Sequence, residues 1–191
     1  DFKYYDPGHL LGRDVFGACL GIIGMGRIGK EVAKRARGFD MTVLYHNRTP
    51  LGAQADALGA HYVVLQELLK HADFIALNAP LTPQTRNMIG EAELRAMKPE
   101  AYLINTARGG VVDQDALLRA LTEGWIAGAA LDVTEPEPLP RDHPLLGLSN
   151  VIITPHLGTS TVDTRRRMGE MTCENLVAGL SGEVLRYPVV G

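Results

Sequence analysis

Cysteine is scarce in this chain of 191 residues, which contains only Cys19 and Cys173. Two cysteines cannot form the disulfide framework of a small secreted domain, and their spacing does not match that of a zinc site. Cys19 lies in an apolar run, and Cys173 lies in a segment with helical periodicity. We therefore expect two buried, unreactive thiols and no bound metal.

Long apolar runs and an excess of charge of either sign are also missing. No stretch approaches the ~20 consecutive apolar residues that a membrane-spanning helix requires. The first residues, DFKYYDPGHLLG, lack the basic-then-apolar pattern of a secretion signal. The 19 basic and 22 acidic side chains give a net charge of -3, which disfavours nucleic acid as the main partner. These absences predict a cytoplasmic protein without a membrane or nucleic-acid partner.

Short apolar runs alternate with segments of helical periodicity between residues 18 and 180. This alternation is typical of a parallel sheet with helices on both faces. The strands are predicted at Ala18–Ile23, Thr42–Tyr45, His61–Val64, Phe74–Leu77, Ala101–Asn105, Ala127–Asp132 and Val151–Thr154. The predicted fold class is therefore α/β with a doubly wound parallel sheet.

Helices are predicted at Lys30–Phe39, Gly90–Met97, Gln114–Glu123 and over a long last segment that ends near Gly179. Asp113 is a favourable N-cap for the third of these helices, because its carboxylate can accept a hydrogen bond from the first turn. Ser160 and Asp163 resemble a capping box at the start of the last helix. Three of these helices therefore lie between consecutive predicted strands, as the crossovers of a parallel sheet require, and the fourth follows the last strand.

A glycine-rich motif, Gly24-Met25-Gly26-Arg27-Ile28-Gly29, directly follows the first predicted strand and opens the first helix. In a Rossmann-type site Gly24 would allow the tight turn, Gly26 would let the backbone approach a pyrophosphate, and Gly29 would permit close packing of helix and strand. The helix N-terminus would face the phosphates. The motif in this context predicts a dinucleotide-binding site.

The end of the second predicted strand indicates which dinucleotide binds. An NAD-type site has an acidic residue there, which bonds to the ribose 2′-hydroxyl. This chain has Asn47, Arg48 and Thr49 instead. A neutral amide beside a planar cation suits a 2′-phosphate, so we expect NADP(H), with NAD(H) possible. The alternative is that Arg48 is only a solvated turn residue and that NAD binds.

Three polar segments follow later strands: Ile104–Gly110, Ala130–Pro138 and Thr154–Gly158. The carboxyl ends of the strands form the edge where ligands bind in an open α/β sheet, so Arg108, Glu137 and His156 can converge there. Each residue alone has an ordinary explanation, as a surface ion pair, a loop charge or a core histidine. Together, at three neighbouring strand ends, they are not explained in this way, and they can converge beside a bound nicotinamide.

Several long motifs occur in order along the chain: GIIGMGRIG, PLTPQTRNMIG, LINTARGGVVDQDAL, AGAALDVTEPEPLP, HPLL and TPHLGTSTVDTR. In these motifs the sequence resembles the D-isomer-specific 2-hydroxyacid dehydrogenase family, and most of all its glyoxylate/hydroxypyruvate reductase branch. The resemblance implies an enzyme that reduces a small 2-keto acid to a D-2-hydroxy acid by hydride transfer from a nicotinamide cofactor.

The resemblance also implies roles for particular residues. Arg108 would grip the substrate carboxylate and keto oxygen, His156 would be the general acid/base, and Glu137 would bond to His156. The implied cofactor-binding residues are Gly24, Gly26, Arg27, Ile28, Gly29, Asn47, Arg48, Thr49, Pro80, Thr106, Ala107, Arg108, Asp132, His156 and Gly158.

Residues 1–17 and 181–191 lack the periodicity of the central region 18–180. They resemble an inter-domain connection with a dimerisation arm, and the stub of the return crossing to a substrate domain that is largely absent. We therefore expect 18–180 to be the dinucleotide-binding domain of a homodimer whose isolated chain has low activity. Two alternatives stay open: another D-2-hydroxyacid dehydrogenase, such as phosphoglycerate dehydrogenase, and a corepressor-like binding module that senses a dinucleotide.

Overall fold

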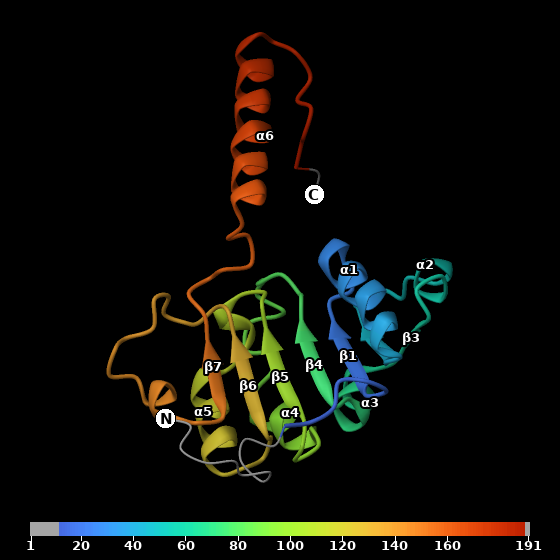
Figure 1. Ribbon diagram of the computed structural model, residues 1–191, viewed down its shortest axis with the longest axis vertical. Coiled ribbons are helices and arrows are strands. Elements are labelled where there is room, and N and C mark those ends of the chain that lie inside the picture. The colour runs from blue at the N-terminus through green and yellow to red at the C-terminus, as the bar shows by residue number, and fades with distance from the viewer. Residues whose placement is uncertain (1–11, 190–191) are drawn as a thin grey trace, which may run out of the picture. The chain divides into compact units, whose positions relative to one another are not determined.

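The computed structural model describes residues 12–189 and contains a seven-stranded sheet (Figure 1). All neighbouring strands are parallel, and their order is β3-β2-β1-β4-β5-β6-β7. The strands are β1 (Cys19–Ile23), β2 (Thr42–His46), β3 (Ala60–Tyr62), β4 (Phe74–Leu77), β5 (Tyr102–Asn105), β6 (Gly128–Leu131) and β7 (Val151–Ile153). The predicted α/β fold with a doubly wound parallel sheet is confirmed.

The helices are α1 (Arg27–Ala36), α2 (Ala53–Asp56), α3 (Leu65–His71), α4 (Glu91–Ala96), α5 (Gln114–Thr122) and α6 (Val162–Leu180). Short 3₁₀ helices are η1 (Arg37–Phe39), η2 (Gly109–Val111) and η3 (Pro144–Gly147). Sequence analysis did not predict α2 or α3. Asp113 caps α5 as predicted, but the N-cap of α6 is Thr161, whose hydroxyl accepts a bond from the Thr164 N–H, and the prediction of Ser160 was wrong.

The chain divides into two compact units, Asp1–Pro155 and His156–Gly191, and each is described by itself. The first unit contains the whole sheet and the helices α1 to α5. The second contains α6 and the segment after it. The predicted boundaries of the dinucleotide-binding domain at 18–180 stay a prediction, and residues 1–11 of the predicted arm lie outside the described residues.

The first unit has a separate apolar core on each face of its sheet. Side chains alternate along β1, so Leu20 and Ile22 pack with α1 and α2 on one face, while Ile23 packs with α3, α4 and α5 on the other. Gly21 also faces α3, where a Cβ would lie 2.5 Å from Cδ2 of Leu68. The absence of a side chain at Gly21 therefore sets how closely α3 approaches the sheet.

One face of the sheet is less covered than the sequence predicts. Over β4 to β7, the side chains of Phe74, Tyr102, Ile104 and Ile152 line a hollow of about 420 Å³. The rings of Phe74 and Tyr102 stack with their centroids 5.6 Å apart, and Ile152 is 67% exposed. Among residues 12–155, the helices on this face pack over β1 to β3 (Figure 1).

The second unit consists of α6 and an extended segment that pairs with it. The side-chain amide of Asn175 pairs with the backbone of Tyr187, donating to its carbonyl at 2.8 Å and accepting from its N–H at 2.9 Å. Arg167 donates to the Tyr187 hydroxyl at 2.7 Å.

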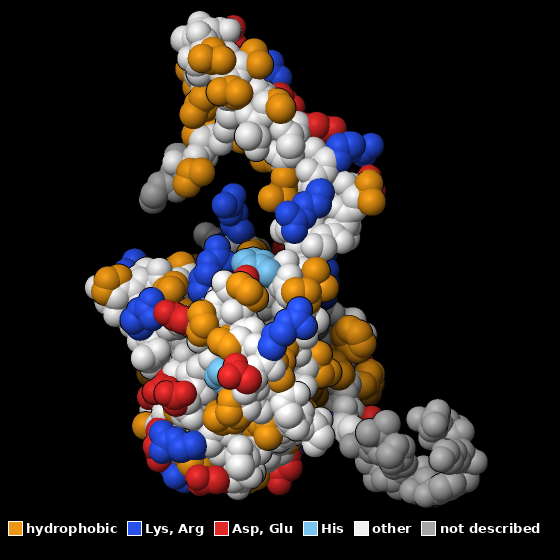
Figure 2. Space-filling model, turned by 90° about the vertical axis from the view of Figure 1, so that its left-hand side faces the viewer, with side chains coloured by type: hydrophobic (Ala, Val, Ile, Leu, Met, Phe, Trp, Pro, Cys, Tyr) orange, Lys and Arg blue, Asp and Glu red, His pale blue; other side chains and the backbone are white. Residues whose placement is uncertain are grey.

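Within residues 12–189, no helix has both the length and the apolar character needed to cross a membrane. Figure 2 shows apolar side chains on the surface of this unit and interspersed positive and negative side chains on the visible face of the first unit.

The two cysteines differ from the expectation of buried thiols. Cys173 is exposed on α6, so that prediction was wrong for this residue. Cys19 is half-buried in β1. Its burial raises the pKa of the thiol, and the nearby carboxylate of Asp73 raises it further, which keeps the unreactive thiol form.

Asp73 is a buried carboxylate at the start of β4 that joins three parts of the first unit. Its Oδ1 accepts from the Arg13 guanidinium at 2.9 Å and from Lys98 Nζ at 2.7 Å, and its Oδ2 accepts from the Cys19 N–H at 2.8 Å. Burial on its own would raise the pKa of Asp73. The bonds from Lys98 and Cys19 and the charges of Lys98 and Arg13 outweigh that effect and hold the pKa below its ordinary value.

Replacing Asp73 by asparagine should lower the free energy of unfolding at neutral pH by about 1–3 kcal/mol, because two cations and one N–H lose their carboxylate. Since the folded-state pKa lies below the ordinary value of about 3.9, this stabilisation is present above that pH and is lost as the pH falls through the folded pKa. Urea unfolding at neutral pH and at about pH 3 should show a wild-type advantage that shrinks in acid.

The matched control is Asp163→Asn, which changes an exposed pair with Arg166 and should alter stability by less than about 0.5 kcal/mol. A difference between wild type and Asp73→Asn that is the same at both pH values would show that the carboxylate charge is not the stabilising element.

Candidate functional site

The candidate site lies where the winding of the sheet reverses, between β1 and β4. From β1 the chain proceeds to β2 and β3 on one side, and from β4 it proceeds to β5, β6 and β7 on the other. Loops that leave the carboxyl ends of two such strands diverge and leave a crevice. Two cavities, of about 580 and 710 Å³, occupy this position and share Asn78, Ala79 and Pro80 as lining residues.

The glycine motif forms the wall of these cavities on the β1 side. Gly24 has φ +92°, and a Cβ on it would lie 2.5 Å from the backbone nitrogen of Ala79. A Cβ on Gly29 would lie 2.7 Å from the carbonyl oxygen of Gly24. A Cβ on Gly26 would meet no atom within 4 Å, so this residue leaves open space at the start of α1. The tight turn at Gly24 and the close packing at Gly29 agree with the predicted roles.

Asn47 connects the end of β2 to the glycine motif. Its Oδ1 accepts a hydrogen bond from the backbone N–H of Met25 at 2.6 Å. Because this oxygen is engaged, the side chain can offer a ligand its amide nitrogen, which is a donor. Asn47, Arg48 and Thr49 all line the larger cavity, and their predicted role in binding the cofactor stays a prediction. Within residues 12–189, exposed Arg48 has no ion-pair partner.

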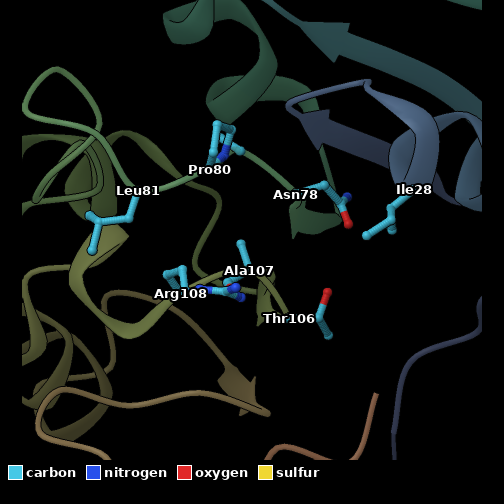
Figure 3. A pocket seen from close by; sticks show the side chains of 8 residues that line it. Ile28, Asn78, Pro80, Leu81, Thr106, Ala107 and Arg108 are labelled. Carbon is cyan, nitrogen blue, oxygen red and sulfur yellow. The ribbon is translucent and has the colours of Figure 1, made fainter. Parts of the chain in front are cut away.

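The turn after β5 carries Thr106, Ala107 and Arg108 along the smaller cavity (Figure 3). The buried side chain of Asn105 holds this turn, since its Nδ2 donates to the Arg108 carbonyl at 3.0 Å and its Oδ1 accepts from the Ala107 N–H at 3.0 Å. Sequence reasoning assigned no role to Asn105. The available signal was an amide side chain at a strand end, where such residues favour local bonds to the backbone.

Gln114, the first residue of α5, holds the loop after β6 that carries Glu137. Its Nε2 donates to the Glu135 carbonyl at 2.8 Å, and its Oε1 accepts from the Glu135 N–H at 3.2 Å. The Glu135 carboxylate also pairs with Arg86 at 3.0 Å. Sequence reasoning missed Gln114, because its partner lies 21 residues further along the chain.

Asp132, at the end of β6, accepts a hydrogen bond from the Thr154 hydroxyl at 2.5 Å, which ties the carboxyl ends of β6 and β7 together. His156 follows this strand end and begins the second unit, where its φ of +55° lies in the left-handed region. Non-glycine residues in that region concentrate at functional sites. Arg108 and Glu137 belong to the first unit and His156 to the second, so their convergence stays a prediction.

A family model described as "D-isomer specific 2-hydroxyacid dehydrogenase, NAD binding domain" matches residues 2–158 of this chain. The chain belongs to this family. The matched region includes the glycine motif, the end of β2, Arg108, Glu137 and His156. The expected dehydrogenase fold and family are therefore confirmed, whereas the roles of individual residues stay proposals.

This dehydrogenase domain is 53% identical to the glyoxylate reductase of Korarchaeum cryptofilum over 180 residues, which are 94% of this chain and 54% of the relative. Among solved structures, the TT0316 protein of Thermus thermophilus matches with a TM-score of 0.92 and 50% identity over 98% of this chain and 58% of that one. A glyoxylate reductase from Paecilomyes thermophila matches with a TM-score of 0.84 and 45% identity over 92% and 53%. The chain spans about half the length of these proteins.

Gly24 and Gly26 differ in how much an added methyl group would destabilise the fold. Gly24→Ala should lower the free energy of unfolding by about 1–3 kcal/mol, because its φ of +92° and the approach of Ala79 both oppose a Cβ. Gly26→Ala adds its methyl to open space and should cost less than about 1 kcal/mol. Thermal unfolding of both variants tests this difference, and equal destabilisation would contradict the geometry of the turn.

Proposed function

We propose that this chain is the NADP(H)-binding part of an enzyme that reduces a small 2-keto acid of the glyoxylate/hydroxypyruvate class to the D-2-hydroxy acid. The observation that carries the proposal is the position of Asn47 and Arg48 on the same cavity as the glycine motif. The family match and the glyoxylate reductase relatives support the reaction class. A homodimer and a cytoplasmic location stay predictions.

A dinucleotide fits the residues of the crevice. The open space at Gly26 allows a pyrophosphate to approach the backbone, and a helix N-terminus offers unpaired N–H groups and a positive partial charge to such an anion. Arg27 and Ile28 form the first turn of α1 at this point. Pro80, Thr106 and Ala107 line the adjoining cavity, on the side where the nicotinamide would lie.

The residues at the end of β2 favour a phosphate on the adenosine ribose. Asn47 offers an amide donor and brings no negative charge, and exposed Arg48 offers a guanidinium that can bind a phosphate through two N–H groups. Thr49 adds a hydroxyl beside them. An acidic residue at position 47 would repel the same phosphate.

The proposed reaction adds a hydride to the keto carbon, breaks the C=O π bond and places a proton on the oxygen. The reduced nicotinamide supplies the hydride when it is bound. Arg108 would bind the substrate carboxylate and stabilise the charge that develops on the keto oxygen. His156 would hold the transferred proton on a ring nitrogen, and Glu137 would orient that ring. Proton transfer by such a general acid contributes roughly 10²–10⁴-fold to the rate.

Arg48→Ala tests the choice of cofactor. A charge-assisted bond contributes about 1.5–3 kcal/mol, so the variant should bind NADPH roughly 10- to 100-fold more weakly and NADH almost unchanged. Isothermal titration calorimetry measures both affinities. Arg37→Ala, which removes an exposed arginine outside both cavities, is the control and should leave them unchanged. Tighter binding of NADH than of NADPH by the unmutated chain would refute the cofactor assignment.

The turnover rate tests whether the residues of this chain are sufficient for catalysis. Catalysis requires reacting atoms held within about 3–3.5 Å, and this chain spans 54% of the Korarchaeum glyoxylate reductase. The chain should therefore bind NADPH but reduce glyoxylate at least ~10²-fold more slowly than that relative. His156→Ala should remove the residual turnover and should change NADPH affinity much less than it changes turnover. Steady-state assays at saturating NADPH decide this, and turnover equal to that of the relative would show that these residues contain the complete substrate site.

A further inference from the structure

The side-chain amide nitrogen of Asn78 is buried and has no hydrogen-bond partner within residues 12–189. Asn78 directly follows β4, and its backbone N–H donates to the Ile23 carbonyl at 2.8 Å. A buried donor without an acceptor carries its full desolvation penalty, and folded proteins retain few such groups. The amide therefore needs an explanation beyond the fold of the apo chain.

Asn78 stands where the two cavities of the site meet. It lines the cavity that contains Ile28 and Arg108, and it also lines the cavity that contains Gly26 and Asn47. Figure 3 shows the Asn78 side chain directed toward Ile28 of α1 across the smaller cavity. A ligand that extends from the larger cavity to the smaller one must pass this side chain.

The chemistry of an amide indicates which part of a dinucleotide contacts the Asn78 side chain. A side-chain amide both donates and accepts, and its last torsion is broad, so its two ends can exchange places at little cost. A pyrophosphate only accepts, and the glycine motif and α1 already face it. A ribose hydroxyl both donates and accepts, and one ribose lies between the pyrophosphate and the nicotinamide of a dinucleotide.

We propose that Asn78 positions the cofactor by hydrogen bonding through its side-chain amide to the hydroxyls of the ribose next to the nicotinamide. This inference rests on the proposed dinucleotide-binding function. The amide nitrogen, which has no partner among residues 12–189, gains one when the dinucleotide binds. Asn78 then fixes the ribose between the phosphate-binding backbone and the Arg108 side of the site.

The proposal predicts that a variant without the Asn78 amide loses cofactor affinity without losing stability. Asn78→Leu removes the amide at similar volume, so NADPH affinity should fall roughly three- to tenfold, as expected for one lost neutral hydrogen bond. Affinity for 2′,5′-ADP, which lacks the second ribose, should not change. The unfolding temperature of the variant without ligand should not fall, because the lost amide nitrogen has no partner among residues 12–189. Asn78→Ala should weaken NADPH binding similarly, which excludes a clash with leucine as the cause.

The matched control is Asn150→Leu, because the Asn150 amide does have a partner, the Leu121 carbonyl at 3.1 Å. This variant should unfold at a lower temperature and bind NADPH with unchanged affinity. Calorimetric titration and thermal unfolding give all the values.

The possible failures are distinguishable. Wild-type NADPH affinity in both Asn78 variants would overturn the inference alone. So would an equal loss of 2′,5′-ADP affinity, or a fall in the unfolding temperature of Asn78→Leu as large as that of Asn150→Leu. An unmutated chain that binds neither ligand would overturn the proposed function and the inference with it.

Discussion

The close backbone approach between Gly24 and Ala79 is the constraint on which the rest of the site depends. The loops that leave β1 and β4 touch here, at a distance that leaves no room for a Cβ on residue 24. This contact brings the start of α1 beside the loop that carries Asn78 and Pro80. Both cavities are bounded by these two loops, so a displacement of either would change the binding surface for the whole length of a dinucleotide.

Side-chain amides fix the other loops of the site. Asn47 accepts from the glycine motif, Asn105 closes the turn that carries Arg108, and Gln114 pairs with the backbone of Glu135. An amide has one donor end and one acceptor end, so it can bond to a peptide group as another peptide group would. These bonds give irregular loops the backbone partners that strands and helices obtain from their neighbours.

The strands and the glycine motif could be predicted from the sequence because their signals are local. The amide bonds could not, since Asn47 and Gln114 bond to residues 22 and 21 positions away. The helix α2 was missed because four residues are too few to show a helical period. Ser160 and Thr161 both have a hydroxyl that can cap a helix, so only the backbone identifies Thr161 as the residue before α6. The convergence of the proposed catalytic residues depends on how two compact units are arranged, which no local signal specifies.

The bond between Asn47 and Met25 limits which residues can stand at the end of β2. The acceptor at position 47 supports the glycine motif, so a residue there needs an oxygen in the same place to keep this bond. Asparagine and aspartate both provide it, and they differ in whether the second atom is an amide nitrogen or a carboxylate oxygen, and hence by one charge. Either residue at position 47 could therefore accept the bond from Met25, while the charge beside the larger cavity would differ by one unit. The geometry of the turn and the charge beside the cavity can therefore vary independently at this one position.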